Sequence, residues 1–135
     1  VTCLVSAIGY VRTAEGLQEA VRRMGTLLAP GGTLLVDPWF EPGQLTHGRI
    51  TTLVAEGEGH SVCRMSRTVV EGRMSRLEFE YLVGRESGVE RRSELHELGL
   101  FTQGEMEEAF SRAGLAVERQ SGALRTRGLY VGWRA

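Results

Sequence analysis

The chain has 135 residues, of which 41% are hydrophobic and 24% charged, so it can bury a core and falls outside the disordered and collagen-like classes. A formal net charge of -1 gives no basic surface for nucleic acid, and no apolar run approaches the roughly 20 residues that a membrane-spanning helix needs. Cys3 and Cys63 lack the spacing of a metal site. We therefore expect reduced thiols in a cytoplasmic protein, with no nucleic-acid or membrane partner.

The amino-terminal part predicts a strand, a helix and a second strand. Residues 1–5 (VTCLV) are apolar and β-branched, and residues 6–10 (SAIGY) follow as a loop. Apolar residues at three-four spacing predict a helix over about 14–29, with Thr13 as its N-cap. Pro30 and two glycines end that helix, and TLLV at 33–36 reads as a buried strand. This order predicts a βαβ unit with two parallel strands.

The alternation of predicted strands and helices stops after Pro38 and resumes near residue 101. Glycine-bearing turns separate four strand-like runs, near 49–56, 61–70, 73–84 and 89–100, which predicts an antiparallel meander. Thr102 and Glu105 then form a capping-box pattern before a helix that Gly114 ends. Two last strands, 115–118 and 129–133, are joined by a polar loop at 119–128. They predict an antiparallel hairpin at the sheet edge.

Candidate ligand contacts follow two predicted strands, where open α/β sheets bind ligands. Trp39 and Phe40 come just after one strand and Tyr10 just after the other, and each ring reads either as core packing or as a pocket wall. Arg127, before the last strand, is either a surface arginine or a partner for phosphate. His96 alternates with leucines, so it is a core residue or a group that accepts a proton. Three histidines without cooperating ligands argue against a metal site.

The order of elements resembles the second half of a class I S-adenosylmethionine-dependent methyltransferase. LAPGGTLLVDPWF resembles that family's LxPGG turn before its fifth strand, VTCLVSAIGYV its fourth strand with the following loop, and RGLYVGWR its seventh strand. DPWF, the antiparallel insert, LHELGLF and RGLYVG are similar to the N,N-dimethyltransferases that act on nucleotide-linked amino sugars. The resemblance covers essentially the whole chain. It implies an α/β fold, namely the second half of a Rossmann-like methyltransferase sheet with an inserted antiparallel β-sheet.

The resemblance also divides the chain and assigns roles. Residues 1–38 would be a partial methyltransferase core, 39–100 the insert over the substrate site, and 101–135 the helix and hairpin that complete the core. S-adenosylmethionine would be the cofactor and a small molecule the substrate. The implied contacts are Leu4, Val5 and Ser6 for the cofactor and Trp39, Phe40, His96 and Arg127 for the substrate.

The family's glycine-rich loop and its acidic cofactor ligand are not in this sequence. The chain also begins with Val1, inside an apolar run. Both features lead us to expect the carboxyl-terminal portion of a longer protein, inactive on its own. Tyr10 is a departure, because amino-sugar members place a histidine, a candidate base, after the same SxIG.

Two functions are therefore expected. The first is a portion of an S-adenosylmethionine-dependent methyltransferase, in which His96 or Tyr10 receives the proton and Trp39 and Arg127 position the acceptor. Methyl transfer from a sulfonium needs alignment and exclusion of water more than acid-base help, so no compact catalytic motif is expected. The alternative is a non-catalytic binding or dimerisation module that uses the antiparallel sheet, since an alternating sheet face does not distinguish a pocket roof from an interface. A homodimer is one possible assembly.

Overall fold

The computed structural model describes residues 1–122 and 127–134. The chain divides into two compact units, which we call the core unit (Val1–Gln44 with Leu98–Ala135) and the sheet unit (Leu45–Glu97). Each is described by itself. The domain boundaries expected from the sequence, after residues 38 and 100, and the placement of the insert over a substrate site stay predictions.

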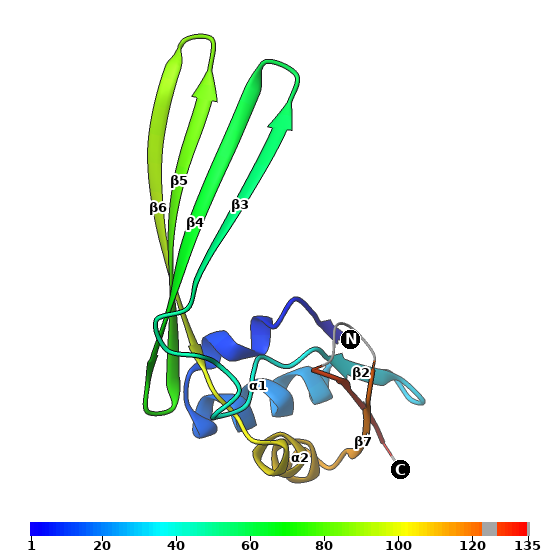
Figure 1. The fold of residues 1–135 in the computed structure, drawn as a ribbon. Helices are drawn as coiled ribbons and strands as arrows, with labels where there is room; N and C mark the ends of the chain where they lie inside the picture. Colours follow the sequence, from blue (N-terminus) through cyan, green and yellow to red (C-terminus); the bar gives the residue numbers. More distant parts are fainter. Residues whose placement is uncertain (123–126, 135) are drawn as a thin grey trace. The chain divides into compact units, whose positions relative to one another are not determined.

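The core unit contains a mixed sheet of four strands in the order β1-β2-β8-β7 (Figure 1). The predicted parallel pair is confirmed, because β1 runs parallel to β2, and the predicted terminal hairpin is confirmed, because β7 pairs antiparallel with β8. β8 also pairs antiparallel with β2, which leaves β7 at the edge. The strands are β1 (Thr2–Cys3), β2 (Thr33–Val36), β7 (Ala116–Gln120) and β8 (Leu129–Trp133).

Two α-helices belong to this unit, α1 (Ala14–Thr26) and α2 (Gln103–Arg112). Both predicted caps are present: Thr13 accepts from the Gly16 amide, and Thr102 forms a capping box with Glu105. Neither of these described helices is long and apolar enough to cross a membrane.

The core of this unit lies between the helices and the sheet. Its fully buried side chains come from the segment after β1, from both α-helices and from strands β2 and β8, so these elements are held together by shared packing. The largest of them are Ile8, Leu17, Leu34, Met106, Phe110 and Tyr130.

Two elements are shorter than the sequence predicts. The helix expected over 14–29 ends at Thr26, because Pro30 cannot donate a hydrogen bond and its ring would clash with the carbonyl of the residue four positions earlier. The strand expected over 1–5 ends at Cys3, because Val5 and Ser6 take positive φ angles of 56° and 57°. The loop expected at 6–10 is instead largely a 3-10 helix, η1 (Ala7–Val11).

The sheet unit confirms the predicted meander. Four strands lie side by side in chain order, and β4 pairs antiparallel with both β3 and β5 (Figure 1). Their bounds are β3 (Ile50–Gly57), β4 (His60–Glu71), β5 (Met74–Arg85) and β6 (Gly88–Gly99), of which the last two residues belong to the core unit. Only Val69 and Ser75 are buried among residues 45–97.

Candidate functional site

Asp37 lies at the carboxyl end of β2 and is almost fully buried, at 5% exposed. Its Oδ2 accepts a hydrogen bond of 3.1 Å from the Ser6 amide, and the Ser6 hydroxyl donates to the Pro38 carbonyl at 3.0 Å. The segments that follow β1 and β2 are therefore joined through side chains. The other carboxylate oxygen, Oδ1, is buried without a hydrogen-bond partner among the described residues.

Arg127 directs its guanidinium group toward the same place. One terminal nitrogen lies 3.9 Å from Asp37 Oδ2. The guanidinium carbon lies 5.4 Å from the centre of the Trp39 ring and 5.1 Å from that of Phe40, which is cation-π distance. The two rings meet edge to face with centroids 4.8 Å apart. The structure thus brings Arg127 next to Trp39 and Phe40, although Arg127 is far from both in sequence. It adds Asp37 to these three residues.

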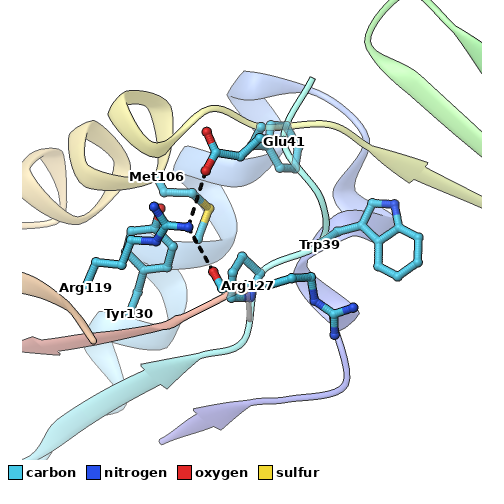
Figure 2. A pocket seen from close by; sticks show the side chains of 8 residues that line it. Trp39, Glu41, Met106, Arg119, Arg127 and Tyr130 are labelled. Atoms are coloured by element: carbon cyan, nitrogen blue, oxygen red, sulfur yellow. Dashed lines mark hydrogen bonds and ion pairs between the residues drawn. The ribbon is translucent and has the colours of Figure 1, made fainter. Parts of the chain in front are cut away.

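Arg119 forms a second cationic centre beside Arg127 (Figure 2). Its guanidinium donates to the Gln103 side chain at 2.7 Å and to the main-chain carbonyl of Arg127 at 3.0 Å. It also lies 3.3 Å from Glu41 Oε1. The side chain is mostly buried, at 24% exposed, so these contacts are screened less than those of a surface pair.

A small cavity of about 10 Å³ lies among these residues, which is room for roughly one water molecule. Trp39, Arg119 and Arg127 line it together with Tyr130 (Figure 2). Burial raises the pKa of Tyr130 to about 12, so its hydroxyl is neutral at physiological pH. The cavity is too small to hold a substrate.

The loop after β1 carries the three residues expected to contact a cofactor. Val5 is 88% exposed and Leu4 is 43% exposed, whereas Ser6 is buried. A β-branched residue with positive φ is rare and costs free energy, and such strain is concentrated at functional sites. Exposed apolar side chains at the carboxyl ends of parallel strands fit one wall of a cofactor pocket. Their role in cofactor binding stays a prediction.

Tyr10 and His96 are the two candidate proton acceptors. Tyr10 lies in η1 and is half exposed, at 49%. His96 belongs to the sheet unit, where its ring meets that of Phe79 edge to face with centroids 5.2 Å apart. His96 Nε2 lies 3.2 Å from Glu94 Oε2, which also accepts from the Tyr81 hydroxyl at 3.1 Å. The hydrogen bond from His96, followed by that from Tyr81, lowers the pKa of Glu94.

This pairing favours one tautomer of His96. If Nε2 donates to the carboxylate, the lone pair of the neutral ring lies on Nδ1. His96 is therefore a partly exposed histidine with an acidic neighbour, and not a fully buried core residue. Its role as a proton acceptor stays a prediction.

One face of the sheet unit exposes large apolar side chains. Pairing places Ile50, Val54, Met65 and Leu82 on it, because Met65 lies opposite Thr52, and Cys63 lies opposite both Val54 and Leu82. Ser93 donates to Glu80 on the same face, so alternation adds Val89 and Leu95. We call these six residues the apolar face. They are 50% to 74% exposed.

Sequence reasoning missed Glu41, Arg119 and the structural use of Asp37. Asp37 offered one signal, since it is the sole aspartate and directly follows a buried strand. Glu41 and Arg119 offered none, because residues so far apart in sequence meet only once β2, α2 and β7 have packed. The sequence had no means to pair this glutamate, among 17 acidic residues, with that arginine.

No protein-family model matches the chain. It is 37% identical over 134 residues to dTDP-4-amino-2,3,4,6-tetradeoxy-D-glucose N,N-dimethyltransferase of Saccharopolyspora spinosa, covering 99% of this chain and 54% of that protein. It is 38% identical over 133 residues to dTDP-3-amino-3,4,6-trideoxy-alpha-D-glucopyranose N,N-dimethyltransferase of Streptomyces venezuelae, covering 98% of this chain and 56% of that protein. The chain is a homologue of about half of a sugar N,N-dimethyltransferase.

Solved structures agree with this relationship. DesVI of Streptomyces venezuelae matches with a TM-score of 0.95 and 38% identity, over 100% of this chain and 58% of that one. CalS10 of Micromonospora echinaspora, an amino pentose methyltransferase solved with SAM bound, matches with a TM-score of 0.91 and 36% identity, over 100% of this chain and 57% of that one. The expected family resemblance and fold class are therefore confirmed, and only part of the Rossmann-like fold is present. The chain spans a little over half the length of the relatives that it matches.

Proposed function

We propose that this chain is the carboxyl-terminal portion of an S-adenosylmethionine-dependent N-methyltransferase that acts on a nucleotide-linked amino sugar. The observation that carries the proposal is the identity of 37% to 38% along 98% to 99% of the chain with two enzymes named for that reaction. The free thiols of Cys3 and Cys63 are in keeping with a cytoplasmic enzyme.

The bound cofactor would supply a methyl group already activated on a sulfonium. The residues of this chain then have to orient the acceptor and exclude water. Arg127 is suited to a diphosphate, because its guanidinium is planar and carries several donors. Trp39 and Phe40 flank that guanidinium and offer flat apolar surface to a ring-shaped group. Leu4 and Val5 would contact the cofactor, and Ser6 would fix their loop through Asp37.

The acceptor amine must lose a proton when it gains a methyl group. His96 or Tyr10 would receive it. Asp37 and Glu41 lie beside arginines, so their carboxylates serve as counter-charges in this scheme and not as bases.

Titration of the complete protein with S-adenosylmethionine tests the class directly. The complete protein is needed because the glycine-rich loop that the family uses is absent from these residues. We expect saturable binding of one cofactor per chain by calorimetry. Absence of binding would contradict the methyltransferase proposal, whatever the acceptor.

A second function is favoured by the apolar face of the sheet unit. We infer that this face meets the same face of a second copy in a homodimer. The face carries charges of both signs, including Arg91 with Glu80 at 2.9 Å and Arg67 with Glu78 at 3.3 Å, so a two-fold arrangement can place opposite charges together. A hollow of about 590 Å³ lined by Ile50, Met65 and Leu95 interrupts it, and side chains of a partner could fill this space.

Sedimentation of the complete protein tests the homodimer. We expect a dimer whose dissociation constant rises when the apolar face is made polar. A monomer at high protein concentration would contradict the assembly and leave the methyltransferase proposal untouched. A dimer that binds no cofactor would favour the non-catalytic module over the enzyme.

A further inference from the structure

We propose that Arg119 is a positioning residue that holds Arg127 in place for the substrate. The inference rests on the proposed function, because the role of Arg127 in binding a nucleotide-linked substrate is itself proposed. Arg119 does not need to touch the substrate. It acts on the main chain of Arg127, whose carbonyl accepts a hydrogen bond of 3.0 Å from the Arg119 guanidinium (Figure 2).

Arg119 is well placed to be the fixed member of the pair. It lies in β7, directly opposite Tyr130 of β8, and its guanidinium carbon is 5.9 Å from the centre of the Tyr130 ring. Tyr130 is itself 2% exposed and part of the core. The arginine is therefore anchored on a paired strand against a buried ring, whereas Arg127 precedes β8 in a turn.

Three segments converge on this guanidinium. Glu41 follows β2, Gln103 begins α2, and the Arg127 carbonyl belongs to the segment before β8. The planar fork of an arginine can serve several acceptors at fixed angles, which a lysine ammonium cannot do with the same rigidity. The contact with Glu41 supplies the opposite charge that a mostly buried cation requires.

Arg127 is then held at both ends. Its carbonyl is bound by Arg119, and its guanidinium is placed by Asp37, at 3.9 Å, and by the rings of Trp39 and Phe40. The Arg127 Nε is buried without a hydrogen-bond partner among the described residues. A side chain so restrained loses little further freedom when it binds an anion, and preorganisation of this kind strengthens binding.

A double-mutant cycle in the complete protein tests the inference, with thymidine diphosphate as the probe and its dissociation constant as the readout. Arg127→Gln should weaken binding roughly tenfold, as expected for the loss of one charged hydrogen-bond donor. Arg119→Gln should weaken it several-fold. The double variant should bind no worse than Arg127→Gln alone, because a positioning residue has nothing left to position.

Independent effects that multiply in the double variant would overturn the inference, since they would mean that Arg119 supports the fold or the ligand by another route. No loss in Arg119→Gln would overturn it as well, while Arg127 kept its proposed role. No loss in Arg127→Gln would overturn both the inference and that role, but cofactor titration would still test the methyltransferase class.

Two further variants keep the test interpretable. Arg119→Lys preserves the charge beside Glu41. We expect its dissociation constant to lie between those of the wild type and Arg119→Gln. Arg112→Gln removes an exposed arginine of α2 that pairs with Glu108 within one helix, and it should leave the dissociation constant unchanged. Thermal unfolding of each variant verifies that the proteins compared are folded.

Discussion

The two units of the chain differ in where their apolar side chains lie. Among its described residues, the core unit buries eleven hydrophobic side chains in one cluster between its helices and sheet. The sheet unit has longer strands, yet Val69 is the sole apolar residue of 45–97 that is buried. Its six-residue apolar face is exposed, and its charged side chains pair across neighbouring strands.

This difference separates what each unit can do. The core unit can hold side chains at fixed distances, because buried contacts and hydrogen bonds determine their rotamers. The cluster of Asp37, Trp39, Phe40, Arg119 and Arg127 lies there. The sheet unit instead exposes its apolar face, at which we propose that a second copy binds. The candidate site and the exposed apolar face thus lie in different units of one short chain.

The largest expected effect comes from the buried core. Phe110 is fully buried and stacks on Tyr130 with centroids 6.2 Å apart. Phe110→Ala should lower the free energy of unfolding by about 3–5 kcal/mol, the usual range for a buried phenylalanine. Leu82→Ala, on the half-exposed apolar face, is the matched variant in the sheet unit. In chemical denaturation of dilute protein, Leu82→Ala should lower the free energy of unfolding by less than half as much as Phe110→Ala. Equal decreases would contradict the difference between the units.

Asp37 should show an intermediate effect. Asp37→Ala leaves the Ser6 amide without its acceptor in a buried position, which costs about 1–3 kcal/mol. Asp37→Asn keeps an oxygen for that amide and should retain more stability, although it removes the negative charge near Arg127. Denaturant titration of both variants measures the difference. If the two variants had the same free energy of unfolding, the hydrogen bond between Ser6 and Asp37 would not stabilise the fold.

The apolar face gives a prediction about association instead of folding. Leu82→Glu places a charge at the proposed dimer surface and should raise the dimer dissociation constant at least tenfold. Leu53→Glu is the matched control, because Leu53 is 51% exposed and Leu82 is 50% exposed, but Leu53 lies on the opposite face of the sheet. Analytical ultracentrifugation distinguishes them. Equal dissociation by both variants would argue against the face that we propose.

The smallest expected effect is electrostatic and depends on pH. Hydrogen bonds from Arg91 and Ser93 lower the pKa of Glu80 from 4.5 to about 2. A lowered pKa in the folded state means that the pair stabilises the sheet above pH 4.5 and loses this contribution as the pH falls toward 2. Because the pair is exposed, salt should weaken the effect.

Glu80→Gln should flatten that pH dependence. Glu86→Gln, in the turn between β5 and β6, should leave it as in the wild type. Thermal unfolding between pH 5 and pH 2 at low and high salt measures both. A steeper acid loss in Glu80→Gln than in the wild type would have the wrong sign for a pair that stabilises the folded sheet.

Local chemistry explains why much of the fold was predictable. Thr13 and Thr102 mark helix starts through hydrogen bonds within one turn, and glycine-bearing turns mark the ends of the strands in the meander. Pro30 also acts locally, but its effect reaches four residues back, so the helix ends earlier than its apolar pattern. The positive φ of Val5 was not predictable, because β-branched residues avoid this conformation and no local sequence pattern requires it.

The site was predictable only in part. Trp39 and Phe40 could be placed because they directly follow a buried strand. Arg127 was proposed for its chemistry, and its partners came from the fold. The contact between Glu41 and Arg119 joins segments that are distant in sequence, so no local pattern could reveal it.

Methyl transfer by the complete protein tests the central claim most directly. The protein would be incubated with S-adenosylmethionine and a dTDP-linked amino sugar, and the sugar product analysed by mass spectrometry. We predict a product heavier by one or two methyl groups, formed much more slowly by Arg127→Gln at limiting sugar. The protein must first be shown to fold and to bind the cofactor. If it then methylated no member of a panel of such amino sugars, the account would be contradicted.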